Sequence, residues 1–114
     1  MTIRRAIPTL YTEDLGSARE FYERFLGFEV AMDEPDLMLF RSPSNPTAQV
    51  IAGSQRGLDQ ARVSVEVADV DAVYEEAVRR NLEIVYPLTD EPWHVRRFFV
   101  RDPSGVVVNV ASHN

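Results

Sequence analysis

Hydrophobic and polar residues alternate without a break over residues 62–67, "RVSVEV". A period of two over six residues predicts a β-strand that is buried on one side. The strand divides into a valine side and a polar side: Val63, Val65 and Val67 against Arg62, Ser64 and Glu66. The valines are expected in the core, so the polar side faces either bulk water or a ligand.

Two segments show the helical period instead. Residues 13–28, "EDLGSAREFYERFLGF", predict an amphipathic helix with Asp14 as N-cap and Gly27 as the stop. Its expected apolar stripe consists of Ala18, Phe21, Tyr22, Phe25 and Leu26. A second helix is predicted over residues 69–81, "DVDAVYEEAVRRN".

The order of elements repeats along the chain. Each helix follows one strand and precedes three more, which are expected near 28–32, 37–41 and 48–52 and near 83–86, 95–101 and 106–112. Asp14 and Asp69 lie almost half the chain apart, as an internal duplication would place them. The sequence therefore predicts an α+β fold of two βαβββ modules, about 1–53 and 62–114, joined by a linker at 54–61.

Alternation also assigns faces on the other strands. Phe98 and Val100 would share the core side, and Val108 and Val110 would join them from the last strand. The opposite side then carries Arg97, Phe99, Arg101, Val107, Asn109 and Ala111, and on the first strand Ile7, Thr9 and Tyr11 if Leu10 packs under the helix. Charges mixed with aromatic rings favour a ligand cleft. The alternative is that these residues form the solvent-exposed face of an antiparallel sheet.

The composition of the chain excludes several classes of protein. A chain of 114 residues with 45% hydrophobic residues predicts one compact domain. The net charge of -6 argues against nucleic-acid binding, and no apolar run approaches a membrane span, so a soluble cytoplasmic protein is expected. With no cysteine, any metal site is left to His, Asp and Glu, and the histidines are His94 and His113.

Three stretches then carry a resemblance: "AREFYERFLGF", "VADVDAVYEEA" and "FFVRDPSGVVVNV". In this order they resemble the vicinal oxygen chelate superfamily of glyoxalase I, fosfomycin-resistance transferases, extradiol dioxygenases and bleomycin-resistance proteins. The resemblance implies curved mixed sheets that form a cup-shaped cleft, with the polar side of residues 62–67 inside the cup. All twelve basic residues of the chain are arginines, which indicates a GC-rich bacterial genome.

The enzymes of that superfamily hold a divalent metal at positions that the resemblance places on Ile7, Arg62 and Asn109. Isoleucine cannot coordinate, arginine repels a dication, and a neutral amide is a poor ligand for zinc or iron. Neither a metal nor another cofactor is therefore expected.

With the metal-dependent enzymes set aside, the resemblance favours the metal-free, bleomycin-resistance-like branch of the superfamily. The best-known members of this branch sequester drugs. The segment "EPWHVRRFFVRDPSG" is similar to its Pro-Trp segment, which makes Trp93 a candidate stacking platform; packing on the core or at a dimer seam is the alternative. The resemblance predicts a protein that binds a small organic ligand, aromatic or antibiotic, and does not catalyse. A homodimer is also expected, because two open half-cups leave sheet edges and apolar rims that symmetric pairing covers. The expected ligand-binding residues are Thr9, Tyr11, Arg62, Ser64, Glu66, Trp93, Arg97, Phe99 and Asn109.

An enzyme is the second hypothesis: a lyase, isomerase or dioxygenase-like protein in which Glu66 or His94 transfers a proton. Each candidate has a simpler interpretation. Glu66 can neutralise a neighbouring arginine such as Arg62, Arg97 or Arg101, and His94 can be a surface residue of a loop. His113 is expected in a frayed tail.

Overall fold

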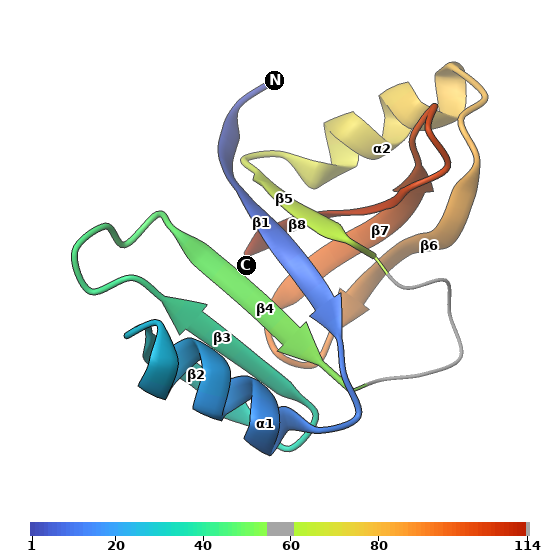
Figure 1. The fold of residues 1–114 in the computed structure, drawn as a ribbon. Helices are drawn as coiled ribbons and strands as arrows, with labels where there is room; N and C mark the ends of the chain where they lie inside the picture. The colour runs from blue at the N-terminus through green and yellow to red at the C-terminus, as the bar shows by residue number, and fades with distance from the viewer. Residues whose placement is uncertain (55–60, 114) are drawn as a thin grey trace. The chain divides into compact units, whose positions relative to one another are not determined.

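The computed structural model describes residues 1–54 and 61–113, so most of the predicted linker, residues 55–60, lies outside the described residues (Figure 1). The chain divides into two compact units. The N-terminal unit begins at Ile7 and contains the rest of the first half. The C-terminal unit combines Met1–Ala6 with the second half, so the strand β1 (Ile3–Tyr11) contributes residues to both units.

The N-terminal unit contains α1 (Leu15–Arg19), the π-helical η1 (Glu20–Phe25), β2 (Glu29–Glu34), β3 (Leu37–Arg41) and β4 (Gln49–Gly53). Its strands follow the order β2-β3-β4-β1, with β4 parallel to β1 and the other pairs antiparallel. The helical segment lies along one face of this sheet (Figure 1). Met38, Phe40 and Ala52 form the buried centre of that contact.

The helical segment of this unit begins and ends as the sequence predicts. Asp14 caps it by accepting from the Ser17 backbone N–H at 2.9 Å, and the Ser17 hydrogen bonds hold the pKa of Asp14 below its usual value. Gly27 follows the last turn with φ of 87°, which glycine adopts without steric cost.

The predicted apolar stripe is correct at two of its five positions. Ala18 and Tyr22 pack on the buried cluster, but Phe21, Phe25 and Leu26 are 50%, 73% and 52% exposed. The physical reason is the π turn, in which the Leu26 N–H donates to the Phe21 carbonyl at 3.0 Å. An i→i−5 bond winds the last turn more slowly than 3.6 residues per turn, so its side chains leave the predicted face.

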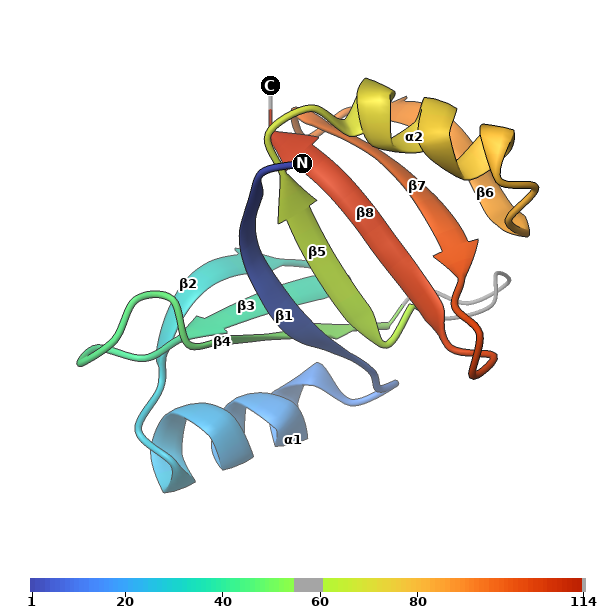
Figure 2. The ribbon, with the colours of Figure 1, turned by 90° about the horizontal axis from the view of Figure 1, so that it is seen from above.

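The C-terminal unit contains β5 (Val63–Val67), α2 (Val70–Arg79), β6 (Ile84–Glu91), β7 (Val95–Arg101) and β8 (Val107–His113). Its strands follow the order β5-β8-β7-β6, with β5 parallel to β8 and the remaining pairs antiparallel. Both halves therefore show the strand-helix-three-strand order, and the α+β prediction is confirmed. Figure 2 shows α2 along one face of this sheet.

The register of the C-terminal unit agrees with the alternation. Val67, Val70, Ala77, Phe98 and Val110 form its buried cluster, with Val65, Val100 and Val108 packed against it. A buried serine joins β8 to the start of α2: the Ser112 hydroxyl donates to the Val67 carbonyl at 2.8 Å and accepts from the Val70 N–H at 3.1 Å. This contact satisfies one of the free N–H groups that every helix start leaves.

The Asp-Pro-x-Gly motif forms the turn between β7 and β8. One Asp102 carboxylate oxygen accepts from the backbone N–H of Ser104 at 2.8 Å and of Val106 at 3.0 Å. Together with the Ser104 hydroxyl, these donors hold the pKa of Asp102 below its usual value. Gly105 has φ of 90°, so the motif is a structural turn that aligns β7 with β8.

Among the described residues, no helix is long and apolar enough to cross a membrane.

Candidate functional site

The face of the C-terminal sheet opposite α2 gathers most of the predicted polar residues. We call it the polar face and define it by Ser64, Glu66, Tyr86, Glu91, Arg97, Phe99, Asn109 and Ala111. Strand pairing arranges them in rows: Glu66, Ala111 and Arg97 in one, and Ser64, Asn109, Phe99 and Tyr86 in the next. Strands lie about 4.8 Å apart, so Glu66 and Arg97 flank the small Ala111 across about 10 Å.

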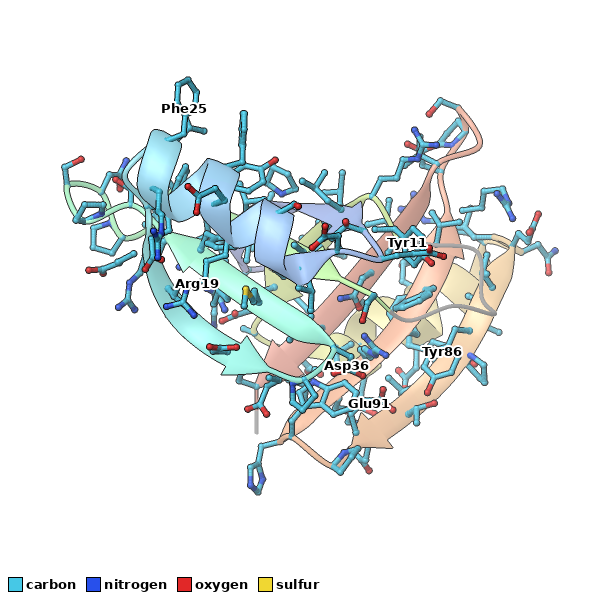
Figure 3. All side chains as sticks on the ribbon, turned by 60° about the horizontal axis from the view of Figure 1, so that its bottom comes forward. Tyr11, Arg19, Phe25, Asp36, Tyr86 and Glu91 are labelled. Carbon is cyan, nitrogen blue, oxygen red and sulfur yellow. The ribbon has the colours of Figure 1, made fainter. Side chains whose placement is uncertain are left out.

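An arginine cage occupies the β6-β7 side of this face. The Arg97 guanidinium pairs with Glu91 at 2.8 Å, and its carbon lies 5.6, 5.2 and 4.9 Å from the ring centres of Tyr86, Trp93 and Phe99. Both charged side chains are largely buried, at 17% and 9% exposure. Tyr86 closes the cage by donating its hydroxyl to Glu91 at 3.0 Å (Figure 3). Three rings and one carboxylate thus hold the cation in place.

Two buried polar atoms beside this cage lack a hydrogen-bond partner among the described residues: Arg97 Nε and Asn109 Oδ1. The Asn109 amide donates through Nδ2 to the Ser64 hydroxyl at 3.1 Å. Turning the amide over would satisfy the oxygen but leave the nitrogen unpaired. Because buried polar groups are almost always hydrogen-bonded, this pair marks a place that a ligand or water can complete.

Glu66 has a partner that the sequence analysis missed. Its Oε2 accepts from Arg5 Nε at 2.7 Å and lies 3.0 Å from His113 Nδ1. Glu66 therefore neutralises an arginine, as the simpler interpretation held, but that arginine comes from β1. Alternation along the first strand could have found Arg5, because it shares parity with Ile7 and Thr9.

The prediction of a frayed tail at His113 is wrong. His113 is the last residue of β8 and pairs in register with Val95 of β7. The strand continues this far because β7 supplies a partner along its whole length. Its imidazole consequently stands beside Glu66 on the polar face.

Tyr86 and Glu91 were also missed. Tyr86 lies in the strand predicted near 83–86 but had no face assigned to it, and β6 runs past the predicted end to Glu91. Its pairing with β7 shifts twice, between Ile84 and Tyr86 and between Tyr86 and Thr89. Such irregularities change which residues share a face, so a strict period of two misplaces the side chains that follow. The neighbouring pair Arg96 and Arg97 shows regular alternation: Arg96 binds Asp71 of α2 at 2.9 Å, on the other face.

Trp93 and His94 lie in the three-residue turn that joins β6 to β7. His94 has φ of 65°, the left-handed conformation that closes such hairpins. Its ring is exposed, in agreement with the surface interpretation. Trp93 is 43% exposed and contacts the Arg97 guanidinium, so one side of its ring belongs to the cage.

The remaining candidates lie elsewhere. Arg62 comes one residue before β5, is exposed, and donates its backbone N–H to the Val107 carbonyl at 3.0 Å. Thr9 and Tyr11 belong to the N-terminal unit, where they pair with Ile51 and Gly53 of β4. Tyr11 is 40% exposed, and its hydroxyl donates to Glu13 at 3.1 Å. Leu10 pairs with Ala52 on the helix side of that sheet but is 39% exposed.

The donor chemistry does not fit a divalent metal. Ile7 offers no donor atom, Arg62 is cationic, and Asn109 uses its amide nitrogen on Ser64. In residues 1–54 and 61–113, no three His, Asp or Glu side chains gather as a metal site requires.

Comparison with known proteins places this fold. A profile described as "Glyoxalase/Bleomycin resistance protein/Dioxygenase superfamily" matches residues 5–110. Curated protein sequences give no match. Among solved structures, a glyoxalase/bleomycin resistance protein/dioxygenase superfamily member from Vibrio splendidus is 21% identical, with a TM-score of 0.73 over 97% of this chain and 99% of that one.

Two methylmalonyl-CoA epimerases share the fold as well. The Mycobacterium tuberculosis enzyme is 19% identical, with a TM-score of 0.70 over 99% of this chain and 88% of that one. The Streptomyces coelicolor enzyme, in complex with 2-nitronate-propionyl-CoA, is 17% identical. Its TM-score is 0.78, over 99% of this chain and 96% of that one. At these identities the structures establish the fold alone, while the profile covers most of the chain. The protein belongs to the glyoxalase/bleomycin resistance protein/dioxygenase superfamily.

Proposed function

We propose that this protein binds a small organic ligand on the polar face, without a metal and without catalysing a reaction. The observation that carries the proposal is the arginine cage with two unpaired buried atoms, Arg97 Nε and Asn109 Oδ1. Rigid aromatic surface beside a few unsatisfied polar atoms is the composition of a small-molecule site. We place this activity in the bacterial cytoplasm, with aromatic antibiotics among the first ligands to test.

The charges of the polar face support binding over catalysis. A general base needs a free oxygen within reach of the substrate's proton. Both Glu91 oxygens are held, one by Arg97 and the other by Tyr86, and Glu66 Oε2 is shared by Arg5 and His113. These contacts favour a positioning role for both carboxylates.

A metal-independent lyase or isomerase is the second candidate, favoured by the contact between His113 and Glu66. A carboxylate at Nδ1 fixes the imidazole so that Nε2 is free to accept a proton. In this candidate, proton transfer is the role of Glu66 and His113. His94, exposed and serving the turn, then has a structural role.

A fluorescence titration tests the proposal, because Trp93 is the one tryptophan of the chain and borders the cage. A ligand pool that contains planar aromatic compounds should change its emission, and Asn109→Leu should weaken the response at least about tenfold by removing one polar contact. Asn81→Gly is the matched control: Asn81 has φ of 54°, which glycine tolerates, and it lies at the end of α2.

Analysis of the released ligand separates the two candidates. Ligand recovered unchanged after long incubation supports the binding protein. Conversion that is lost in both Glu66→Gln and His113→Gln would establish the enzyme instead. No response to any aromatic pool would contradict both candidates.

We also propose a homodimer, and the exposed stripe of the first helical segment is the surface that favours it. The ring centres of Phe21 and Phe25 lie 5.3 Å apart, and Phe25 points away from the unit (Figure 3). The pair Glu20 and Arg24, 3.3 Å apart, flanks these rings. Across a two-fold axis Glu20 of one copy can face Arg24 of the other, so the surface complements itself.

Sedimentation at tens of micromolar should therefore show a dimer. Phe25→Glu should raise its dissociation constant at least about tenfold, because a charge replaces an apolar contact. Val78→Glu is the control, since Val78 is 51% exposed on α2. A wild-type monomer, or equal effects of both variants, would contradict the assignment.

A further inference from the structure

We infer that the ligand of the polar face presents a neutral amide-type edge, with one hydrogen-bond acceptor and one donor side by side. Primary amides, lactams and ureides have this edge. The inference rests on the proposed function and adds the chemical class of the ligand. Three observations on the C-terminal unit lead to it.

The first observation is that the charges of the polar face already pair with one another. Arg97 pairs with Glu91 at 2.8 Å, and Glu66 pairs with Arg5 at 2.7 Å. A ligand carboxylate would have to compete with the buried Glu91, and a ligand ammonium would have to compete with Arg5. Breaking either pair would leave a protein charge without its partner in a desolvated place, which opposes an ionic ligand.

The second observation is the chemistry of the two unpaired atoms. Arg97 Nε–H can only donate, and Asn109 Oδ1 can only accept. With the Asn109 Nδ2 donating to the Ser64 hydroxyl, the two atoms fit a ligand that accepts from Nε and donates to Oδ1. A carboxylate would leave Oδ1 facing another acceptor, and an amidinium would leave Nε–H facing another donor. A neutral amide satisfies both.

The third observation is their placement. Arg97 pairs with Ala111 and Phe99 pairs with Asn109, so Arg97 and Asn109 are diagonal neighbours on adjacent strands of one face. Their Cα atoms are about 7–8 Å apart, within reach of long side chains. Ala111 is the strand partner of Arg97 and, like the two unpaired atoms, is buried.

Access to these atoms requires Trp93 to move. The cage rings surround the guanidinium and Nε is buried, while the indole is partly exposed on a three-residue turn. Displacement of the indole gives a ligand room to approach Arg97. Ligand entry should therefore change the fluorescence of Trp93.

Three probes of nearly one shape test the inference: benzoate, benzamide and benzamidine, titrated at neutral pH. Benzoate offers two acceptors and a negative charge, benzamidine as its cation offers donors only, and benzamide offers one of each. We expect benzamide to bind at least about tenfold more tightly than either ion. Chemical-shift changes of the backbone amides, followed by NMR, locate each probe.

Two variants make the test specific to Asn109. Asn109→Leu should remove the preference for benzamide, because it removes the acceptor. Asn109→Asp should shift the preference toward benzamidine, because both oxygens then accept and carry charge. Melting temperatures measured beside the titrations show whether each variant is folded.

The outcomes separate the inference from the proposed function. Benzoate or benzamidine binding as tightly as benzamide to the wild-type protein would overturn the amide class and leave the binding site standing. A benzamide preference that survives in folded Asn109→Leu would also overturn it. If no probe binds and no aromatic pool alters Trp93 emission, the proposed function fails together with the inference.

Discussion

Replacing Phe98 with alanine is expected to lower the free energy of unfolding by about 3–5 kcal/mol. Phe98 is fully buried between α2 and the sheet and meets the Tyr74 ring edge-on at 5.0 Å. Truncation removes this ring and leaves a cavity that the neighbouring strands cannot close. Urea denaturation of the variant, compared with wild type, measures the loss.

Val78→Ala is the control for this measurement. Val78 is on α2 but 51% exposed, and alanine favours a helix, so stability should stay within about 0.5 kcal/mol of wild type. Similar losses for the two variants would mean that Phe98 does not pack as described.

The second large effect is expected at the arginine cage. Glu91→Ala should lower the free energy of unfolding by about 2–4 kcal/mol, because it leaves a largely buried guanidinium without its carboxylate. The three rings and the remaining exposure of Arg97 keep the loss below that of a fully buried ion pair. Denaturation monitored by circular dichroism provides the value.

A double variant and a surface pair control this experiment. Glu91→Leu combined with Arg97→Met should recover much of the loss, because no charge is then stranded and apolar packing replaces the pair. Glu29→Ala breaks the exposed pair with Arg41, 3.0 Å apart, and should lower the free energy of unfolding by less than about 1 kcal/mol. A loss for Glu91→Ala no larger than that for Glu29→Ala would contradict the buried charge pair of the cage.

The cage and the pair formed by Arg5 and Glu66 give the polar face a common character. Each arginine meets a carboxylate close by, so the face is polar but internally neutralised. A binding surface of this kind discriminates by hydrogen-bond pattern and shape, since Coulomb attraction is already satisfied within the protein. This is the physical basis for expecting a neutral ligand.

Several features of this protein were determined by its sequence alone, because their causes are local. Asp14 and Asp69 cap the two helical segments, and Gly27 ends the first, since short-range hydrogen bonds and φ preferences decide these positions. The alternation over 62–67 placed Ser64 opposite Val65 because successive side chains of a strand point to opposite faces. Two strand-helix-three-strand repeats followed from such signals.

The tertiary structure decided which groups meet. Alternation assigns Glu66 to a face, but its partner Arg5 lies 61 residues away and reaches it because β1 begins in the C-terminal unit. Glu91 and Tyr86 join Arg97 through shifts in the pairing of β6 with β7, and the π turn releases Phe25 from the predicted stripe. Periodicity fixes only the direction of a side chain. The identity of its neighbours depends on how strands pair and where they slip, which is why the candidate site became visible only in the folded chain.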